Sequence, residues 1–123
     1  MAKERILLVD DENVVLRALE KALTSRTDCD LIVVATSDSE EAAAILKNEE
    51  QFDILITDLR MKPLNGLDLI DIAQQANPGI KAIVISAYLN EEAIRQIREK
   101  GCSAYVRKPF KLAEVFDAID IAL

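Results

Sequence analysis

Ile54-Leu55-Ile56-Thr57-Asp58 is the stretch that most clearly indicates the fold, because a short apolar run leads directly into a carboxylate. Continuous apolar runs with β-branched residues are typical of strands buried on both faces of a sheet. Four further runs of this kind occupy residues 6–9, 31–35, 82–85 and 104–106. The sequence therefore predicts five buried strands.

The segments between these runs have helical periodicity. Their apolar side chains recur every three or four residues, which covers one face of a helix, in residues 15–23, 42–46, 67–73, 93–97 and 112–123. Ser37 with Glu40 forms a candidate capping box before the second helix, and Asn90 is a candidate N-cap for the fourth. The alternation predicts an α/β fold with a parallel sheet, helices on both faces and right-handed crossovers. The length of 123 residues suits a single domain over residues 1–123.

The composition excludes several classes of function. The net charge is −7, so direct nucleic-acid binding is not expected, because a duplex-binding surface needs clustered basic residues. No stretch approaches the roughly 20 apolar residues of a membrane helix, and no targeting segment is visible. The chain has no His, which excludes His-based catalysis and His-ligated metals. The two cysteines, Cys29 and Cys102, lack metal-ligand spacing and favour a reducing, cytoplasmic location.

Polar residues follow four of the predicted strands. Ligands of such sheets bind beyond the carboxyl ends of the strands, so we expect these residues to converge: Asp10, Asp11, Asp58, Ser86 and Lys108. Three neighbouring carboxylates need a cation among them, and oxygen ligands with open water positions are those that Mg²⁺ prefers. With Mg²⁺ and Lys108 to neutralise phosphoryl oxygens and the Ser86 hydroxyl to donate to one, Asp58 is suited to form an acyl phosphate.

These residues lie in motifs that resemble the receiver domain of two-component response regulators, of the chemotaxis-regulator type. The motifs are Leu8-Val9-Asp10-Asp11-Glu12, Ile56-Thr57-Asp58-Leu59-Arg60-Met61, Val84-Ile85-Ser86-Ala87 and Tyr105-Val106-Arg107-Lys108-Pro109-Phe110. The resemblance spans the whole chain, in order and with similar spacing. It implies a flavodoxin-like fold: a single five-stranded parallel sheet in the order 2-1-3-4-5, doubly wound with five helices. It also implies a phosphoacceptor signalling domain that assists only its own phosphorylation and dephosphorylation, and not an enzyme.

The resemblance further implies a role for each residue of the acidic edge. Asp58 is the phosphoacceptor and a ligand of Mg²⁺. Asp11 binds the metal directly, Asp10 directly or through water, and the backbone carbonyl of Arg60 is another ligand. Lys108 contacts the phosphoryl group, and its bond to the following proline is cis.

Ser86 and Tyr105 are the implied switch. On phosphorylation, Ser86 moves toward the new oxygens and Tyr105 turns inward, a population shift between two packings. The implied phosphodonor is the phosphohistidine of a histidine kinase or of a phosphotransfer protein. The charged surface of the last two helices and the last strand is a candidate face for homodimer or effector contact, with a solvated surface as the alternative.

The loop after Asp58 departs from the family pattern. The family often has Met-Pro here, whereas Lys62 comes before Pro63 in this chain, and Gly66 keeps its usual place. We therefore expect a loop of the same length with a different turn. Arg60 and Tyr88 lie where the family tunes the lifetime of the acyl phosphate, and both side chains are large enough to slow the attack of water.

Other interpretations stay open at this point. Asp10 and Asp11 are also suited to cap a helix, and Asp58 to a turn after a strand. A phosphatase with an aspartyl nucleophile is disfavoured because such enzymes usually have Asp-x-Asp and a cap insertion. A receiver-like interaction domain that takes no phosphate is disfavoured because no acidic or lysine position is missing.

Overall fold

The computed structural model of the protein describes residues 4–26, 30–48 and 51–123. Within these residues strands and helices alternate, five of each, as the sequence predicts. In chain order the elements are β1 (Glu4–Val9), α1 (Asn13–Thr24), β2 (Leu31–Thr36), α2 (Ser39–Lys47), β3 (Ile54–Thr57), α3 (Gly66–Ala76), β4 (Lys81–Ser86), α4 (Glu91–Glu99), β5 (Ala104–Arg107) and α5 (Leu112–Ala122).

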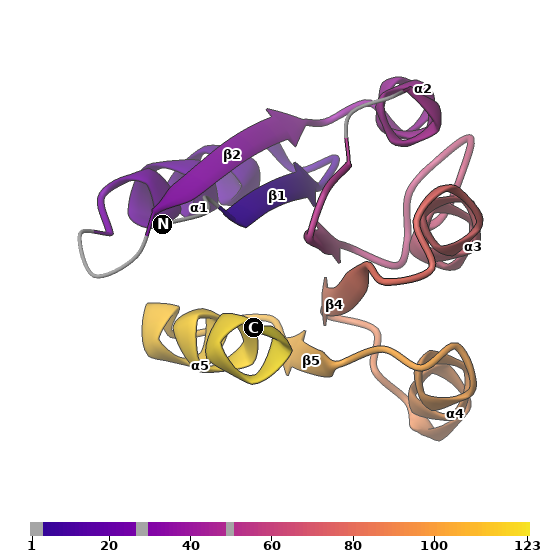
Figure 1. Cartoon of the computed structure of the whole chain (residues 1–123). Coiled ribbons are helices and arrows are strands. Elements are labelled where there is room, and N and C mark those ends of the chain that lie inside the picture. The colour runs from indigo at the N-terminus through magenta and orange to yellow at the C-terminus, as the bar shows by residue number, and fades with distance from the viewer. Residues whose placement is uncertain (1–3, 27–29, 49–50) are drawn as a thin grey trace.

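The strands form one parallel sheet in the order β2-β1-β3-β4-β5, which confirms the predicted topology. Figure 1 shows helices on both faces of the sheet: α1 and α5 cover one face, and α2, α3 and α4 cover the other. In the register of β1 with β3, Val9 lies opposite Thr57. The residues that follow, Asp10 and Asp58, therefore leave the sheet side by side at its carboxyl edge.

The core consists of two apolar layers, one on each face of the sheet. Successive side chains of a strand point to opposite faces. In β3, Leu55 belongs to the layer with α2 and α3, whereas Ile54 and Ile56 belong to the layer with α1 and α5. Burial of each such side chain stabilises the fold by about 1.5–3 kcal/mol. The strand that leads into Asp58 is thus held firmly from both sides.

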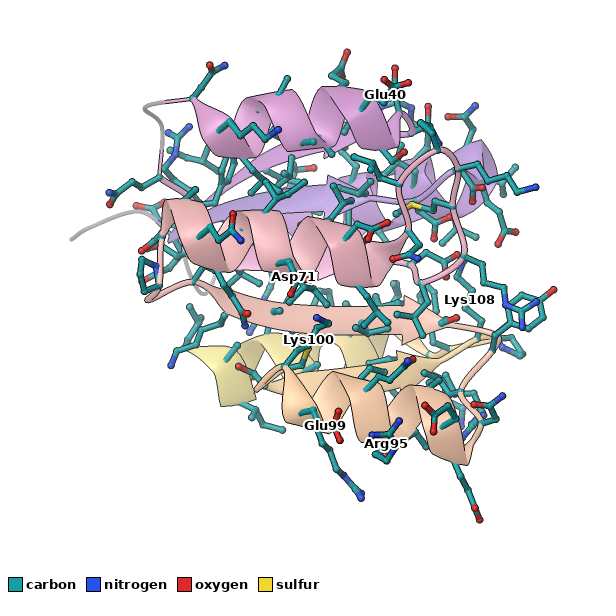
Figure 2. The ribbon with its side chains drawn as sticks, turned by 90° about the vertical axis from the view of Figure 1, so that its right-hand side faces the viewer. Glu40, Asp71, Arg95, Glu99, Lys100 and Lys108 are labelled. Atoms are coloured by element: carbon teal, nitrogen blue, oxygen red, sulfur yellow. The ribbon has the colours of Figure 1, made fainter. Side chains whose placement is uncertain are left out.

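Helix α4 is packed more loosely than the other helices. Ile97 is its only fully buried residue, whereas each of the others buries three or four. At its end, Lys100 Nζ lies 2.6 Å from Asp71 Oδ1 of α3, a pair that Figure 2 labels, and Gln74 Nε2 donates to the Lys100 carbonyl at 2.6 Å. Before its start, Arg107 of β5 donates to a loop carbonyl at 3.0 Å. A few polar contacts therefore hold α4 in place.

The predicted helix starts agree with the structure in part. Asn90 caps α4 with its side chain, as predicted. The predicted capping box of Ser37 and Glu40 is wrong, because Asp38 is the N-cap of α2 and accepts from the Glu40 amide at 2.9 Å. Strand β2 continues to Thr36, whose Oγ1 accepts from the Asp38 amide at 3.1 Å. This turn moves the start of the helix one residue further along the chain.

Two apolar residues of the predicted stripe in α5 are exposed. Leu112 and Leu123 are 45% and 51% exposed, whereas Val115 and Ile119 between them are fully buried. The stripe is therefore shorter than its periodicity suggests. No helix in the described part of the chain is long and apolar enough to cross a membrane.

Candidate functional site

The three predicted acidic residues meet at the carboxyl edge of the sheet. Asp10 and Asp11 follow β1, and Asp58 follows the adjacent strand β3. Each offers a carboxylate oxygen, and these three oxygens all lie within 4.8 Å of one another. Asp10 and Asp58 are buried, whereas Asp11 is exposed. The helix-cap interpretation of the two aspartates is wrong, since Glu12 occupies the N-cap position of α1.

Lys108 brings a positive charge into this cluster from the end of β5, where Figure 2 labels it. Its Nζ lies 2.8 Å from Asp10 Oδ2 and 2.9 Å from Asp58 Oδ2. A third carboxylate oxygen, Glu12 Oε1, lies 2.9 Å from the same nitrogen. The side chains of Lys108, Asp10 and Asp58 are all nearly buried, so these two ion pairs are largely shielded from water. Glu12 is 60% exposed, so the third pair lies at the surface.

The two carboxylate oxygens of Asp58 have different partners. Oδ1 accepts a hydrogen bond from the Leu59 amide at 2.6 Å, and Oδ2 accepts from Lys108 Nζ at 2.9 Å. The Thr57 hydroxyl donates to the backbone carbonyl of Asp58 at 2.8 Å. One carboxylate oxygen of Asp58 is thus held by the backbone of the next residue, and the other contacts Lys108.

The electrostatics of the site reflect burial and ion pairing. Burial raises the pKa of Asp10 above its usual range, and hydrogen bonds from Lys108 and the Glu12 amide reduce this shift only in part. Burial alone would lower the pKa of Lys108, but hydrogen bonds to Asp10, Asp58 and Glu12 outweigh it and raise that pKa. The lysine therefore stays charged throughout the neutral range.

The donor set fits Mg²⁺. The three clustered side chains offer only carboxylate oxygens, which are hard ligands of the kind that Mg²⁺ binds while keeping several waters. Asp11 is exposed, so the cluster is open to water on that side. The carbonyl of Arg60, two residues after Asp58, stays a predicted ligand.

The two predicted switch residues lie apart from the acidic cluster's contacts. Ser86 is fully buried, and its Oγ accepts from the Tyr88 amide at 3.0 Å. Tyr105 is 39% exposed and stands among the exposed large hydrophobic residues. Within the described residues, no hydrogen bond joins Ser86 to Asp58. The switch roles of Ser86 and Tyr105 stay a prediction.

The side chains of Arg60 and Tyr88 stack on each other beside the acidic cluster. The Arg60 guanidinium lies 3.9 Å from the centroid of the Tyr88 ring, which is a cation–π contact. Both residues line a cavity of about 630 Å³ together with Asp11. The cavity lies between the segment that follows β3 and the first turns of α4. Because Asp11 of the acidic cluster also lines it, the stacked side chains border both that cluster and the solvent.

One residue of the site, Glu12, was not singled out from the sequence, and Gly66 was noted only for its place in the family pattern. Glu12 contacts Lys108 across 96 residues of chain, which no local pattern reveals. Gly66 packs so closely on the backbone of Asp58 that a Cβ atom there would overlap the Asp58 carbonyl oxygen. The family spacing of Gly66 was the one signal available for it. The bonds Lys108–Pro109 and Lys62–Pro63 are both cis, and the first was predicted.

The fold and this carboxylate cluster define a class of protein: flavodoxin-like α/β domains with an acidic site at the carboxyl edge of the sheet. The chain is 30% identical to the DNA-binding transcriptional regulator NtrC of Proteus hauseri, over all of this chain and 25% of that protein. It is 30% identical to a response regulator receiver protein of Anaeromyxobacter sp. (strain Fw109-5), over 92% of this chain and 46% of that protein. A response regulator receiver domain protein from Clostridium thermocellum is 26% identical with a TM-score of 0.85, over 97% of this chain and 93% of that one.

The profile of the response regulator receiver domain matches residues 6–120. The chain belongs to this family, so it is a signalling domain of the two-component type. Receiver domains bind Mg²⁺ at their acidic site and interact with histidine kinases and output domains. The chain spans about a quarter to a half of the length of these two curated relatives.

Proposed function

We propose that Asp58 accepts a phosphoryl group from the phosphohistidine of a histidine kinase or a phosphotransfer protein. The observation that carries this proposal is the contact of Asp58 Oδ2 with Lys108 at the centre of the acidic cluster. A response regulator of similar fold from Burkholderia pseudomallei has a phosphorylated aspartic acid and a calcium ion. At 23% identity and a TM-score of 0.82, that likeness supports the fold that the chemistry needs.

The different partners of the two Asp58 oxygens suggest which of them reacts. The Leu59 amide orients Oδ1, which leaves Oδ2 as the nucleophile. A new bond forms between Oδ2 and phosphorus while the bond from phosphorus to the donor nitrogen breaks. The Lys108 ammonium group then contacts the phosphoryl oxygens in place of Oδ2. A positive charge held there stabilises the transfer of the phosphoryl group.

Asp10, Asp11, Asp58 and the carbonyl of Arg60 would hold Mg²⁺, which supplies further positive charge for the phosphoryl oxygens when it is bound. In this proposal the chain's own residues position the Asp58 carboxylate and neutralise the charge of the incoming phosphoryl group. They act on no substrate other than the phosphodonor. We therefore propose a phosphoacceptor domain and not a turnover enzyme, working in the cytoplasm as one domain over residues 1–123.

The switch proposal follows from the contact that Ser86 makes at rest. Its Oγ accepts from the Tyr88 amide, and it has to turn to donate to a phosphoryl oxygen. That movement breaks a contact of the loop before α4, a helix with only one fully buried residue. It also leaves room for the Tyr105 side chain to turn inward. The signal then reaches the face formed by α4, β5 and α5.

This face is our proposed surface for a homodimer or an effector. Its charges include Arg95, which pairs with Glu92 and Glu99 along α4. Exposed pairs of this kind contribute little to stability, so they are available to exchange partners. An output domain elsewhere in a longer protein is also part of this proposal, because the curated relatives extend beyond the matched region.

The test is the intact mass of the protein after incubation with Mg²⁺ and acetyl phosphate. We expect one phosphate adduct, which is lost in Asp58→Ala and kept in Asp117→Ala, an exposed aspartate of α5. Continued release of phosphate from many monoesters would support a phosphatase instead. No adduct from acetyl phosphate or from a cognate kinase would support an interaction domain that takes no phosphate.

A further inference from the structure

Lys108 has one partner that stands outside the acidic cluster. Two of its ion pairs, to Asp10 and Asp58, use residues that also belong to the group of potential metal ligands. The third pair, to Glu12, uses a carboxylate that is not part of that group. Glu12 is 60% exposed, whereas the lysine is 9% exposed, so this pair closes the solvent side of the lysine.

The position of Glu12 is set by the junction of β1 and α1. Its amide donates to Asp10 Oδ1 at 2.9 Å, and its carbonyl accepts from the Leu16 amide at 3.0 Å, which begins the helix. The carboxylate therefore projects from a fixed backbone. The pair with Lys108 joins the start of α1 to the end of β5, two parts of the chain that are 96 residues apart.

The two kinds of partner differ once the cluster holds a divalent cation. The carboxylates of Asp10 and Asp58 then share their charge with the metal, and the metal repels the ammonium group. Glu12 alone keeps its full attraction for the lysine. We propose that Glu12 is a positioning residue, which retains Lys108 beside Asp58 while the acidic cluster is occupied by metal. This inference rests on the proposed phosphoacceptor function and extends it to a residue that makes no contact with the phosphoryl group.

The first test compares Glu12→Gln with the wild-type protein over a range of Mg²⁺ concentrations. Glutamine keeps the size of the side chain and loses the charge. We expect the rate of phosphorylation by acetyl phosphate at saturating Mg²⁺ to fall about fivefold, the upper end for one partly exposed ion pair, while the Mg²⁺ concentration for half-maximal rate changes less. Glu41→Gln on α2 makes the same change of net charge away from the site and is expected to leave both values unchanged.

A double-mutant cycle with Lys108→Ala separates positioning from a general effect of charge. If Glu12 acts through Lys108, Glu12→Gln has no further effect on the phosphorylation rate when the lysine is absent. An equal fall of the rate in both backgrounds would overturn the proposal, because Glu12 would then act on the metal or the donor directly.

The second readout does not depend on phosphorylation. Acetic anhydride modifies exposed lysines, and peptide mass spectrometry measures the extent of acetylation at Lys108, with the exposed Lys81 as reference. In Glu12→Gln we expect Mg²⁺ to raise acetylation of Lys108 several-fold, whereas in the wild type it stays protected. Equal protection in both proteins would overturn the proposal. If no variant takes up phosphate but the acetylation still responds, the retention of Lys108 stands and the phosphoacceptor function fails.

Discussion

Replacement of Gly66 by alanine probes how closely the start of α3 is fitted to the phosphoacceptor. Gly66 is the first residue of α3, and its amide donates to the Leu59 carbonyl at 2.8 Å. A Cβ atom at this position would overlap the carbonyl oxygen of Asp58 and lie 3.0 Å from two more backbone atoms, Asp58 C and Leu59 Cα. All three are main-chain atoms, so no side-chain rotation relieves the overlap.

The expected magnitude follows from these contacts. Carbon atoms pack best at about 3.5–4.0 Å, so the start of α3 and the Asp58 backbone have to separate by about 1 Å. Overpacking of this kind costs typically 1–3 kcal/mol, and the better helix propensity of alanine offsets up to about 1 kcal/mol. Because the overlap with the Asp58 carbonyl oxygen is severe, we take the upper end of the overpacking range, about 3 kcal/mol. After the offset we expect Gly66→Ala to lower the free energy of unfolding by about 2 kcal/mol. Displacement of Asp58 by this distance is expected to slow phosphorylation at least about tenfold.

Urea unfolding and the rate of phosphate uptake from acetyl phosphate measure the two effects. Gly79→Ala is the matched control, because a Cβ atom there meets only Asn77 Oδ1 at 3.5 Å, which is ordinary contact. That variant should unfold within about 0.5 kcal/mol of the wild type and take up phosphate normally. Wild-type stability together with wild-type phosphorylation in Gly66→Ala would refute the reasoning.

Two further predictions concern the surroundings of the site, and a third concerns Cys102, which lies between α4 and β5. Removal of the stack in Arg60→Ala or Tyr88→Ala should shorten the half-life of the acyl phosphate about threefold, in line with ~0.5–1 kcal/mol for a cation–π contact; unchanged dephosphorylation in both, with Lys62→Ala as control, would show that the stack does not exclude water. Mg²⁺ at ten times its Kd should stabilise the fold by about 1.4 kcal/mol in thermal unfolding, and Asp11→Asn should weaken this response. Burial raises the pKa of Cys102 from 9.0 to about 11, so its alkylation rate should rise about tenfold per pH unit up to pH 10, and a plateau near pH 9 would contradict this.

The order of strands and helices could be predicted because each strand is a continuous apolar run and each helix has a clear apolar face. The same property placed the carboxylates correctly, since a residue that follows a parallel strand necessarily lies at the carboxyl edge. Ser37 and Asp38 show where this reasoning ends. Both are good N-caps, and the choice between them depends on how far β2 continues, which its pairing with β1 sets in the folded chain.

Contacts between distant parts of the chain could not be predicted. The contact of Glu12 with Lys108 depends on the positions of α1 and β5 relative to the sheet. No sequence pattern near either residue predicts this contact. The exposure of Leu112 has the same origin, because a helix buries only as much of its stripe as the sheet beneath it covers. The proposed roles of Ser86 and Tyr105 came from the family resemblance and stay predictions.

The loose packing of α4 bears on how such a domain diversifies. A helix that contributes only Ile97 to the fully buried core can accept substitutions at most of its surface without loss of folding. If this face contacts a partner as proposed, mutations there mainly change the choice of partner, whereas mutations in β3 act first on whether the protein folds. On that proposal, new interaction partners can arise on α4 through sequence drift without disturbing the strand that leads into Asp58.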